Sequence, residues 1–133
     1  MIQSMIAIAV GASLGAWCRW GLSLWLDPIH GRLSMGMLAA NLVGAYMVGL
    51  ALAWFAVHPS VSPPWRLFIV TGLLGGLTTF SAFSADTVRL LMREQYGWAL
   101  ITVLVHVLGS FALTAAGFAS LRMLRSNATG LTL

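Results

Sequence analysis

The chain has very little charge. Only 8% of its 133 residues are charged, whereas soluble domains contain roughly one quarter. Hydrophobic residues make up 59% of the sequence, and the mean hydropathy is +0.91. This composition excludes a soluble enzyme and indicates an integral membrane protein.

Cysteine and catalytic patterns are also scarce. Cys18 is the one cysteine, so the chain lacks an internal disulfide and a CxxC pair for redox or metal chemistry. We expect Cys18 to be a small buried apolar residue. No histidine or carboxylate accompanies a serine in the order that a hydrolytic site needs, and no cofactor fingerprint occurs. We therefore predict a protein that is not an enzyme.

Long uncharged runs take the place of the missing charge. They cover residues 1–18, 33–65, 67–85 and 95–121, each close to the roughly 20 residues that a membrane-spanning helix requires. The sequence predicts one all-α membrane domain over residues 1–133, with helices at 5–26, 35–57, 67–91 and 98–121. The first run lacks the basic region of a signal peptide, so we expect it to be the first helix.

The basic residues are arginines at or near the ends of the expected helices. We expect them to contact lipid headgroups rather than nucleic acid. If the helices alternate in direction, one side of the membrane carries Arg66, Arg122 and Arg125, and the other carries Arg19, Arg32, Arg89 and Arg93.

This near balance leaves the orientation open, because an excess of basic residues normally marks the cytoplasmic side. One interpretation is that the charge nearest the first helix still decides. The interpretation that we favour is that copies insert in both directions and pair antiparallel. A closed two-fold pair is the commonest oligomer, and its axis would lie in the membrane plane.

A polar stretch, "GGLTTFSAFSAD" at residues 75–86, interrupts the third expected helix. Glycines at 72, 75 and 76 weaken a helix, and Thr78 and Thr79 can cap a new one, so we predict a break near 75–79. Irregular backbone at membrane depth survives only inside protein or beside a watery cavity or ion. Carbonyls before the break suit a cation, and amides and hydroxyls after it suit an anion.

Two patterns near this break have both a functional and a packing interpretation. Phe80 and Phe83 project on one side of the resumed helix, where their electropositive ring edges can face an anion. In the fourth helix a polar stripe recurs every fourth residue on one face, although single hydroxyls usually bond to their own backbone. The stripe consists of Thr102, His106, Ser110 and Thr114.

Taken together, these residues resemble the Fluc or CrcB family of small dual-topology fluoride channels over nearly the whole chain. The most specific match is "GGLTTFSAF" at 75–83. Supporting matches are "GASLGAWCRW" at 11–20, "NLVG" at 41–44 and "HVLGS" at 106–110.

The resemblance implies an antiparallel homodimer in the bacterial inner membrane, with two pathways for passive fluoride export and a structural sodium ion at its centre. The backbone carbonyls of Gly75 and Thr78 would bind sodium, and Arg19 would support the centre or a vestibule. His106 would stand toward a pore mouth. The residues implied for the fluoride pathway are Asn41, Phe80, Phe83, Ser81, Ser84, His106, Ser110 and Thr114.

The sequence departs from the family pattern at three positions. The family often has threonine where Met37 and Ala82 stand, and glutamate where Asp86 stands. At these positions the resemblance therefore does not decide whether hydroxyl groups line the pathway.

Other classes remain as alternatives. A four-helix drug/proton exchanger would need a carboxylate early in the chain, and the first expected helix has none. A fluoride/proton antiporter would require a proton gradient. A structural assembly protein would use the glycines and the polar stripe for packing and would have no ion selectivity.

Overall fold

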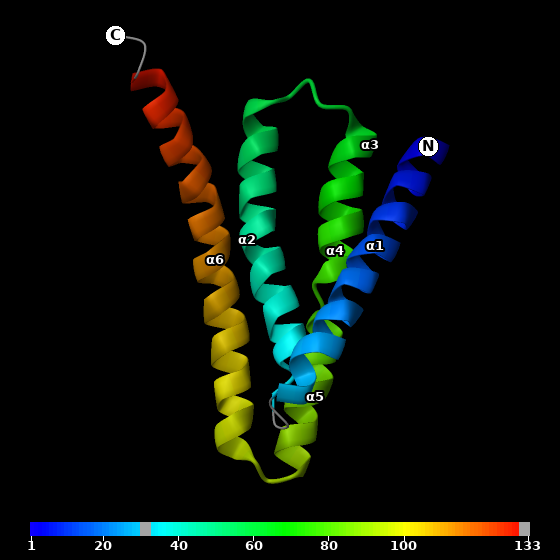
Figure 1. Ribbon diagram of the computed structural model, residues 1–133, viewed down its shortest axis with the longest axis vertical. Helices are drawn as coiled ribbons and strands as arrows, with labels where there is room; N and C mark the ends of the chain where they lie inside the picture. Colours follow the sequence, from blue (N-terminus) through cyan, green and yellow to red (C-terminus); the bar gives the residue numbers. More distant parts are fainter. Residues whose placement is uncertain (30–32, 131–133) are drawn as a thin grey trace.

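The computed structural model describes residues 1–29 and 33–130, and Figure 1 shows that they form long helices joined by short turns. The N-terminal helices are α1 (Ile2–Leu26), the 3-10 turn η1 (Asp27–Ile29) and α2 (Met35–Val57). A composite segment follows, made of α3 (Pro63–Arg66), the π-helix η2 (Leu67–Leu74), α4 (Gly75–Leu77) and α5 (Phe80–Met92). The last helix is α6 (Tyr96–Gly130).

Four helical stretches are long and apolar enough to cross a membrane. They are Ile2–Leu26, Met35–Val57, Pro63–Met92 and Tyr96–Asn127. The predicted all-α chain with four membrane spans is thus confirmed for the described residues.

The helix ends differ from the expected ones by a few residues, and most at α6. α1 begins at Ile2 instead of residue 5, and the third span begins at Pro63 instead of residue 67. Proline fits the first turn of a helix, where its missing N–H would have no helical partner. α6 runs from residue 96 to 130 rather than from 98 to 121, because residues 122–130 contain no proline and continue the helix beyond the apolar run.

α1 lies directly against the third span because glycines face it. A Cβ atom on Gly11 would meet the carbonyl oxygen of Phe68 at 2.5 Å, and one on Gly15 would collide with that of Leu73. Small residues let helix backbones approach closely in membranes. Cys18 lies on the outward face of α1 and is exposed, so the prediction that it is buried was wrong.

α2 and α6 form the other close pair. Cβ atoms on Gly49 and Gly117 would collide with the carbonyl oxygens of Thr114 and Tyr46. A hydrogen bond at 3.1 Å between the hydroxyls of Tyr46 and Ser120 joins the same two helices. These contacts hold the middle of α6 beside α2.

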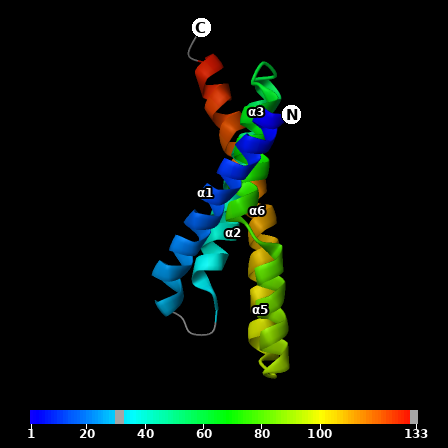
Figure 2. The ribbon, with the colours of Figure 1, turned by 90° about the vertical axis from the view of Figure 1, so that its right-hand side faces the viewer.

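The four spans alternate in direction (Figure 1). The N-terminus, residues 58–62 and the end of α6 lie at one end of the molecule, and the turns after α1 and α5 lie at the other. In Figure 2 the second end divides into two arms, one made of α1 with the start of α2, and the other of α5 with the start of α6.

The arginines follow this division. By their place in the helices, three arginines belong to the half of the molecule that contains the N-terminus: Arg66, Arg122 and Arg125. Three others belong to the half that contains the turn after α5: Arg19, Arg89 and Arg93. Arg32 lies outside the described residues.

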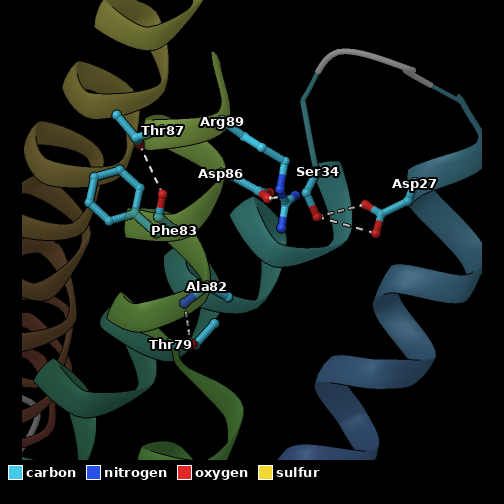
Figure 3. Close-up of polar contacts among 8 residues, drawn as sticks. All are labelled: Asp27, Ser34, Thr79, Ala82, Phe83, Asp86, Thr87 and Arg89. Carbon is cyan, nitrogen blue, oxygen red and sulfur yellow. Dashed lines mark hydrogen bonds and ion pairs between the residues drawn. The ribbon is translucent and has the colours of Figure 1, made fainter. Parts of the chain in front are cut away.

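One carboxylate organises the turn between α1 and α2. An oxygen of Asp27 accepts the backbone N–H of Gly36 at 2.8 Å, and the hydroxyl of Ser34 donates to the same carboxylate at 3.1 and 3.2 Å (Figure 3). A carboxylate in this position satisfies a free N–H and interacts favourably with the helix dipole. Asp27 therefore caps α2.

Candidate functional site

The backbone leaves the helical conformation at two residues of the third span. Thr78 has φ −83° and ψ 155°, and Thr79 has φ −153° and ψ 116°, so both are extended. α4 ends directly before them and α5 begins directly after them. The backbone groups that a continuous helix would pair therefore need other partners.

Asn41 of α2 supplies two of these partners. Its Oδ1 accepts the N–H of Thr79 at 2.7 Å, and its Nδ2 donates to the carbonyl oxygen of Thr79 at 3.1 Å. The side chain is buried, with 9% of its surface exposed, and an unpaired buried polar group costs about 1–3 kcal/mol. Asn41 thus clamps both backbone groups of Thr79, and one N–H of its amide is left for another acceptor.

Thr78 is held from two sides. Its N–H and its hydroxyl both donate to the carbonyl oxygen of Leu74, at 3.0 and 2.9 Å. Its own carbonyl oxygen accepts Nη1 of Arg19 at 3.1 Å. Arg19 is partly buried and faces protein, so a positive charge from α1 lies beside the extended residues. Gly44 is needed opposite, because a Cβ there would collide with the methyl group of Thr78.

Thr79 starts α5. Its hydroxyl accepts the N–H of Ala82 at 3.2 Å (Figure 3) and lies 3.3 Å from the hydroxyl of Ser81. The predicted threonine cap is thus confirmed at Thr79. The N-terminal end of α5, a helix of 13 residues, directs its free N–H groups and the positive end of its dipole toward the break, which favours anions.

The two phenylalanines of α5 have different surroundings. Their ring centroids lie 5.4 Å apart with an interplanar angle of 59°. Phe80 is 76% exposed, whereas Phe83 is 7% exposed and lies against the ring of His106, with centroids 4.7 Å apart. One chain therefore covers Phe83 and leaves Phe80 open at its surface.

Two cavities adjoin these residues. The inner cavity, of about 360 Å³, has among its lining residues Asn41, Thr78, Thr79, Phe80, Phe83 and Ser110. The outer cavity, of about 420 Å³, has among its lining residues Asp27, Ser34, Asp86, Arg89, Arg93 and Thr102. His106 lines both cavities.

The outer cavity carries charge of both signs in equal number. Asp86 forms an ion pair with Arg89 (Figure 3), and Asp27 is engaged at the start of α2. The acidic side chains of this cavity therefore already have partners. Met37, at a position where the resemblance implies a hydroxyl, is buried and gives this cavity an apolar thioether instead.

The predicted site residues divide into two groups. The structure gathers one group around the inner cavity: Asn41, Thr78, Phe80, Phe83, His106 and Ser110. The other group lines neither cavity: Gly75, Ser81, Ser84, Thr114 and Arg19.

The second group has other surroundings. Gly75, Ser81 and Ser84 are exposed on one chain, and a Cβ on Gly75 would meet only the carbonyl oxygen of Val70, at 3.6 Å. The hydroxyl of Thr114 donates to the carbonyl oxygen of Ala45 at 3.1 Å and joins α6 to α2.

Some residues of this region carry no individual signal in the sequence. Asp27, Arg89 and Arg93 meet at the outer cavity, although Asp27 is more than sixty residues from the two arginines along the chain. Because nothing local links a turn before α2 to the end of α5, sequence reasoning missed the outer cavity. The sequence does offer a signal for the cap of α2, because Asp27 and Ser34 stand just before an apolar helix.

The fold and the cavities define an integral, multi-pass membrane protein with a polar interruption in one span. The chain belongs to the CrcB family: residues 6–118 match the family described as "CrcB-like protein, Camphor Resistance (CrcB)". The resemblance inferred from the sequence is thereby confirmed.

Similar proteins cover nearly the whole chain. The "Fluoride-specific ion channel FluC" of Thiobacillus denitrificans is 51% identical over 124 residues, which are 93% of this chain and 100% of the relative. The protein of the same name from Pseudomonas syringae pv. maculicola is 51% identical over 93% of this chain and 98% of its own. That of Pseudomonas putida is 49% identical over 90% and 94%. These relatives are named as ion channels, not as enzymes.

Proposed function

We propose that this protein is a fluoride-selective channel that lets fluoride leave a bacterial cell passively across the inner membrane. The observation that carries the proposal is 51% identity, over 93% of the chain, to proteins named as fluoride-specific ion channels. Identity at this level over four membrane spans, rather than in one motif, supports the same transported ion.

The polar groups of the inner cavity suit a small and strongly hydrated anion. Such an ion must exchange its water for donors at several sites, none so strong that it cannot leave. Asn41 has one N–H left after its bond to Thr79, and Ser110 adds a hydroxyl. The N-terminal end of α5 adds a fixed positive dipole without a full charge.

The aromatic rings supply a second kind of contact. The edges of Phe80 and Phe83 are electropositive because of the ring quadrupole, and we assign them to the fluoride path. Further polar positions on this path are Ser81, Ser84, His106, Ser110 and Thr114. For Thr114 the role requires rotation of its hydroxyl away from Ala45, to which it donates.

A second copy would complete the path. Phe80, Ser81, Ser84 and Gly75 are exposed on one chain although they belong to the polar part of a membrane span. Lipid does not tolerate irregular backbone and polar groups at its centre, so we propose an antiparallel homodimer that buries them and contains two pathways. The near balance of arginines between the two ends supports insertion in both directions.

We also propose a structural sodium ion at the centre of the dimer. In a continuous helix the carbonyl of Gly75 would accept the N–H of Thr79, but that N–H is donated to Asn41. The carbonyl of Thr78 accepts Arg19 and has a second lone pair. Neutral carbonyl oxygens suit a sodium ion, so Gly75 and Thr78 fit it in chemical type, with the same two groups of the second copy. The ion would stabilise the extended residues.

The test is fluoride efflux from liposomes that contain the purified full-length protein, followed with a fluoride electrode. A channel predicts rapid efflux when a potassium ionophore balances the charge and no proton gradient is present. Efflux that depends on a proton gradient would instead support a fluoride/proton antiporter. Absence of fluoride efflux under both conditions would reject the proposal and leave a drug/proton exchanger or a structural role.

The antiparallel arrangement has its own test. A tag at the C-terminus should be accessible from both sides of the membrane in comparable amounts. Accessibility from one side alone would reject dual topology, whatever the transported ion.

A further inference from the structure

His106 stands where the inner and outer cavities meet. It is the residue that the lining of both cavities has in common, and its side chain is 5% exposed. The ring of Phe83 lies against one of its faces, at 4.7 Å between centroids and 32° between planes. The imidazole therefore lies between the two cavities of one chain.

The hydrogen bond of one ring nitrogen fixes the tautomer. Nδ1 of His106 lies 3.0 Å from the carbonyl oxygen of Thr102. Because a carbonyl oxygen can only accept, Nδ1 carries the hydrogen. In the neutral ring, Nε2 is consequently a lone pair, and only a second proton turns it into a donor.

Nε2 has no hydrogen-bond partner among the described residues, and it is buried. A buried polar nitrogen in a native fold normally has a partner, supplied by protein, water or a ligand. The carboxylates of the outer cavity are already engaged, Asp86 by Arg89 and Asp27 by the start of α2. Nε2 is thus a buried nitrogen beside two cavities, and the described residues offer it no partner.

We propose that His106 is a proton-dependent anion site at the junction of the two cavities, where a protonated Nε2 donates its hydrogen to fluoride. This inference rests on the proposed function. It names the atom that contacts fluoride and the protonation state that the contact requires. The proton stays on Nε2 and no covalent bond changes, so fluoride passes as an anion. With a neutral ring the anion meets a lone pair, and passage between the cavities slows.

The charged surroundings of His106 come from three segments. α5 contributes Asp86 and Arg89, the turn after α5 contributes Arg93, and the turn before α2 contributes Asp27. The carboxylates favour a positive ring, and the guanidinium groups and burial oppose it. From α2 the neighbouring cavity residues are Met37 and Asn41, which are uncharged. The protonation of His106 is therefore set locally.

The chain contains a matched control. His58 also has its Nδ1 against the carbonyl oxygen four residues earlier, that of Trp54, at 2.9 Å, and it also stacks on an aromatic ring, that of Trp54. His58, however, is exposed in the loop after α2 and lines neither cavity. The two histidines share a local geometry and differ in burial and in access to the cavities.

The experiment measures passive fluoride efflux from liposomes at equal internal and external pH, in steps across roughly pH 5 to 8, where histidine titrates. For the wild type, efflux should increase as the pH falls, by up to about tenfold per unit, the limit for one proton. His106→Gln keeps an amide N–H that does not titrate, so its efflux should not depend on pH. His58→Gln should keep the wild-type pH dependence. Protein-free vesicles correct for diffusion of the neutral acid HF.

A second measurement tests the same inference without a flux assay. In the wild-type protein with ¹⁵N-labelled histidine, the magnetic resonance signal of His106 should show hydrogen on Nδ1. Added fluoride should increase its protonated fraction at fixed pH, by linkage between proton and anion binding. The signal is assigned by its absence from the His106→Gln protein.

The outcomes separate this inference from the proposed function. Wild-type efflux that is rapid but independent of pH would overturn the role of His106 and leave the fluoride channel intact. The same holds if His106→Gln retains the wild-type pH dependence, or if fluoride leaves the histidine signal unchanged. Absence of fluoride efflux at every pH would overturn both.

Discussion

Two irregular backbone segments of this protein are held by different sets of side chains. In residues 58–62, the exposed loop after α2, Arg66 donates to the carbonyl oxygens of His58, Pro59 and Val61 at 3.0, 3.1 and 3.2 Å. At the break before α5, the neutral amide of Asn41 clamps both backbone groups of Thr79. Inside the span Arg19 adds a single bond, to the carbonyl oxygen of Thr78, whereas in the exposed loop one guanidinium makes all three bonds.

The histidines repeat this contrast. His58 and His106 each place Nδ1 against the carbonyl oxygen four residues earlier and each lie against an aromatic ring. His58 is exposed, so water can reach its second nitrogen. In His106 the second nitrogen is buried without a partner in the described part of the chain. The same local arrangement is therefore structural at the loop and, by our proposal, functional at the cavities.

The largest effect is expected from Asn41→Leu. Leucine has a similar volume but pairs with neither the N–H nor the carbonyl of Thr79, and each buried group left unpaired costs about 1–3 kcal/mol. We expect a lower melting temperature in detergent and loss of fluoride efflux. The control is Asn41→Asp, which can still accept the Thr79 N–H. A Leu variant with unchanged stability and efflux would contradict the clamp.

A smaller and more specific effect is expected from Phe80→Ile. Phe80 is 76% exposed on one chain, so its removal leaves the chain's own core intact, while an aliphatic side chain lacks the electropositive ring edge. We expect a strong decrease in efflux with an unchanged elution volume of the assembled protein. Efflux at the wild-type rate would remove Phe80 from the fluoride path.

The smallest effect is expected from Arg66→Met. Methionine keeps the length of the apolar stem but loses the hydrogen bonds to the loop carbonyls and the position over the ring of Phe55. Since water can replace these bonds at an exposed loop, we expect a loss of about 1 kcal/mol of stability and unchanged efflux. An effect as large as that of Asn41→Leu would show that the loop and the break do not differ in the way described.

The sequence predicted the spans well because their signal is local. Runs of apolar residues of membrane length identified all four helices, and only their ends differed, most at α6, which continues to Gly130. The threonine cap was also predictable, since Thr79 acts on the N–H of Ala82, three residues away. Local composition therefore sufficed for the helices and for the start of α5.

The site was less predictable because its contacts join distant residues. Asn41 was predicted as a donor to fluoride. Its bonds to Thr79, 38 residues away, depend on how α2 packs against the third span, which the local sequence does not reveal. Thr114 belonged to a regular polar stripe, but its hydroxyl donates to Ala45. A period of four residues places a side chain on a face and does not say which neighbour that face meets.

The central claim is that this protein carries fluoride in preference to other halides through the polar break. The most direct measurement is efflux from liposomes loaded with equal concentrations of fluoride and chloride, with both ions followed in the same sample. We expect fluoride to leave rapidly while chloride is retained. Release of both ions at similar rates, or retention of both, would contradict it.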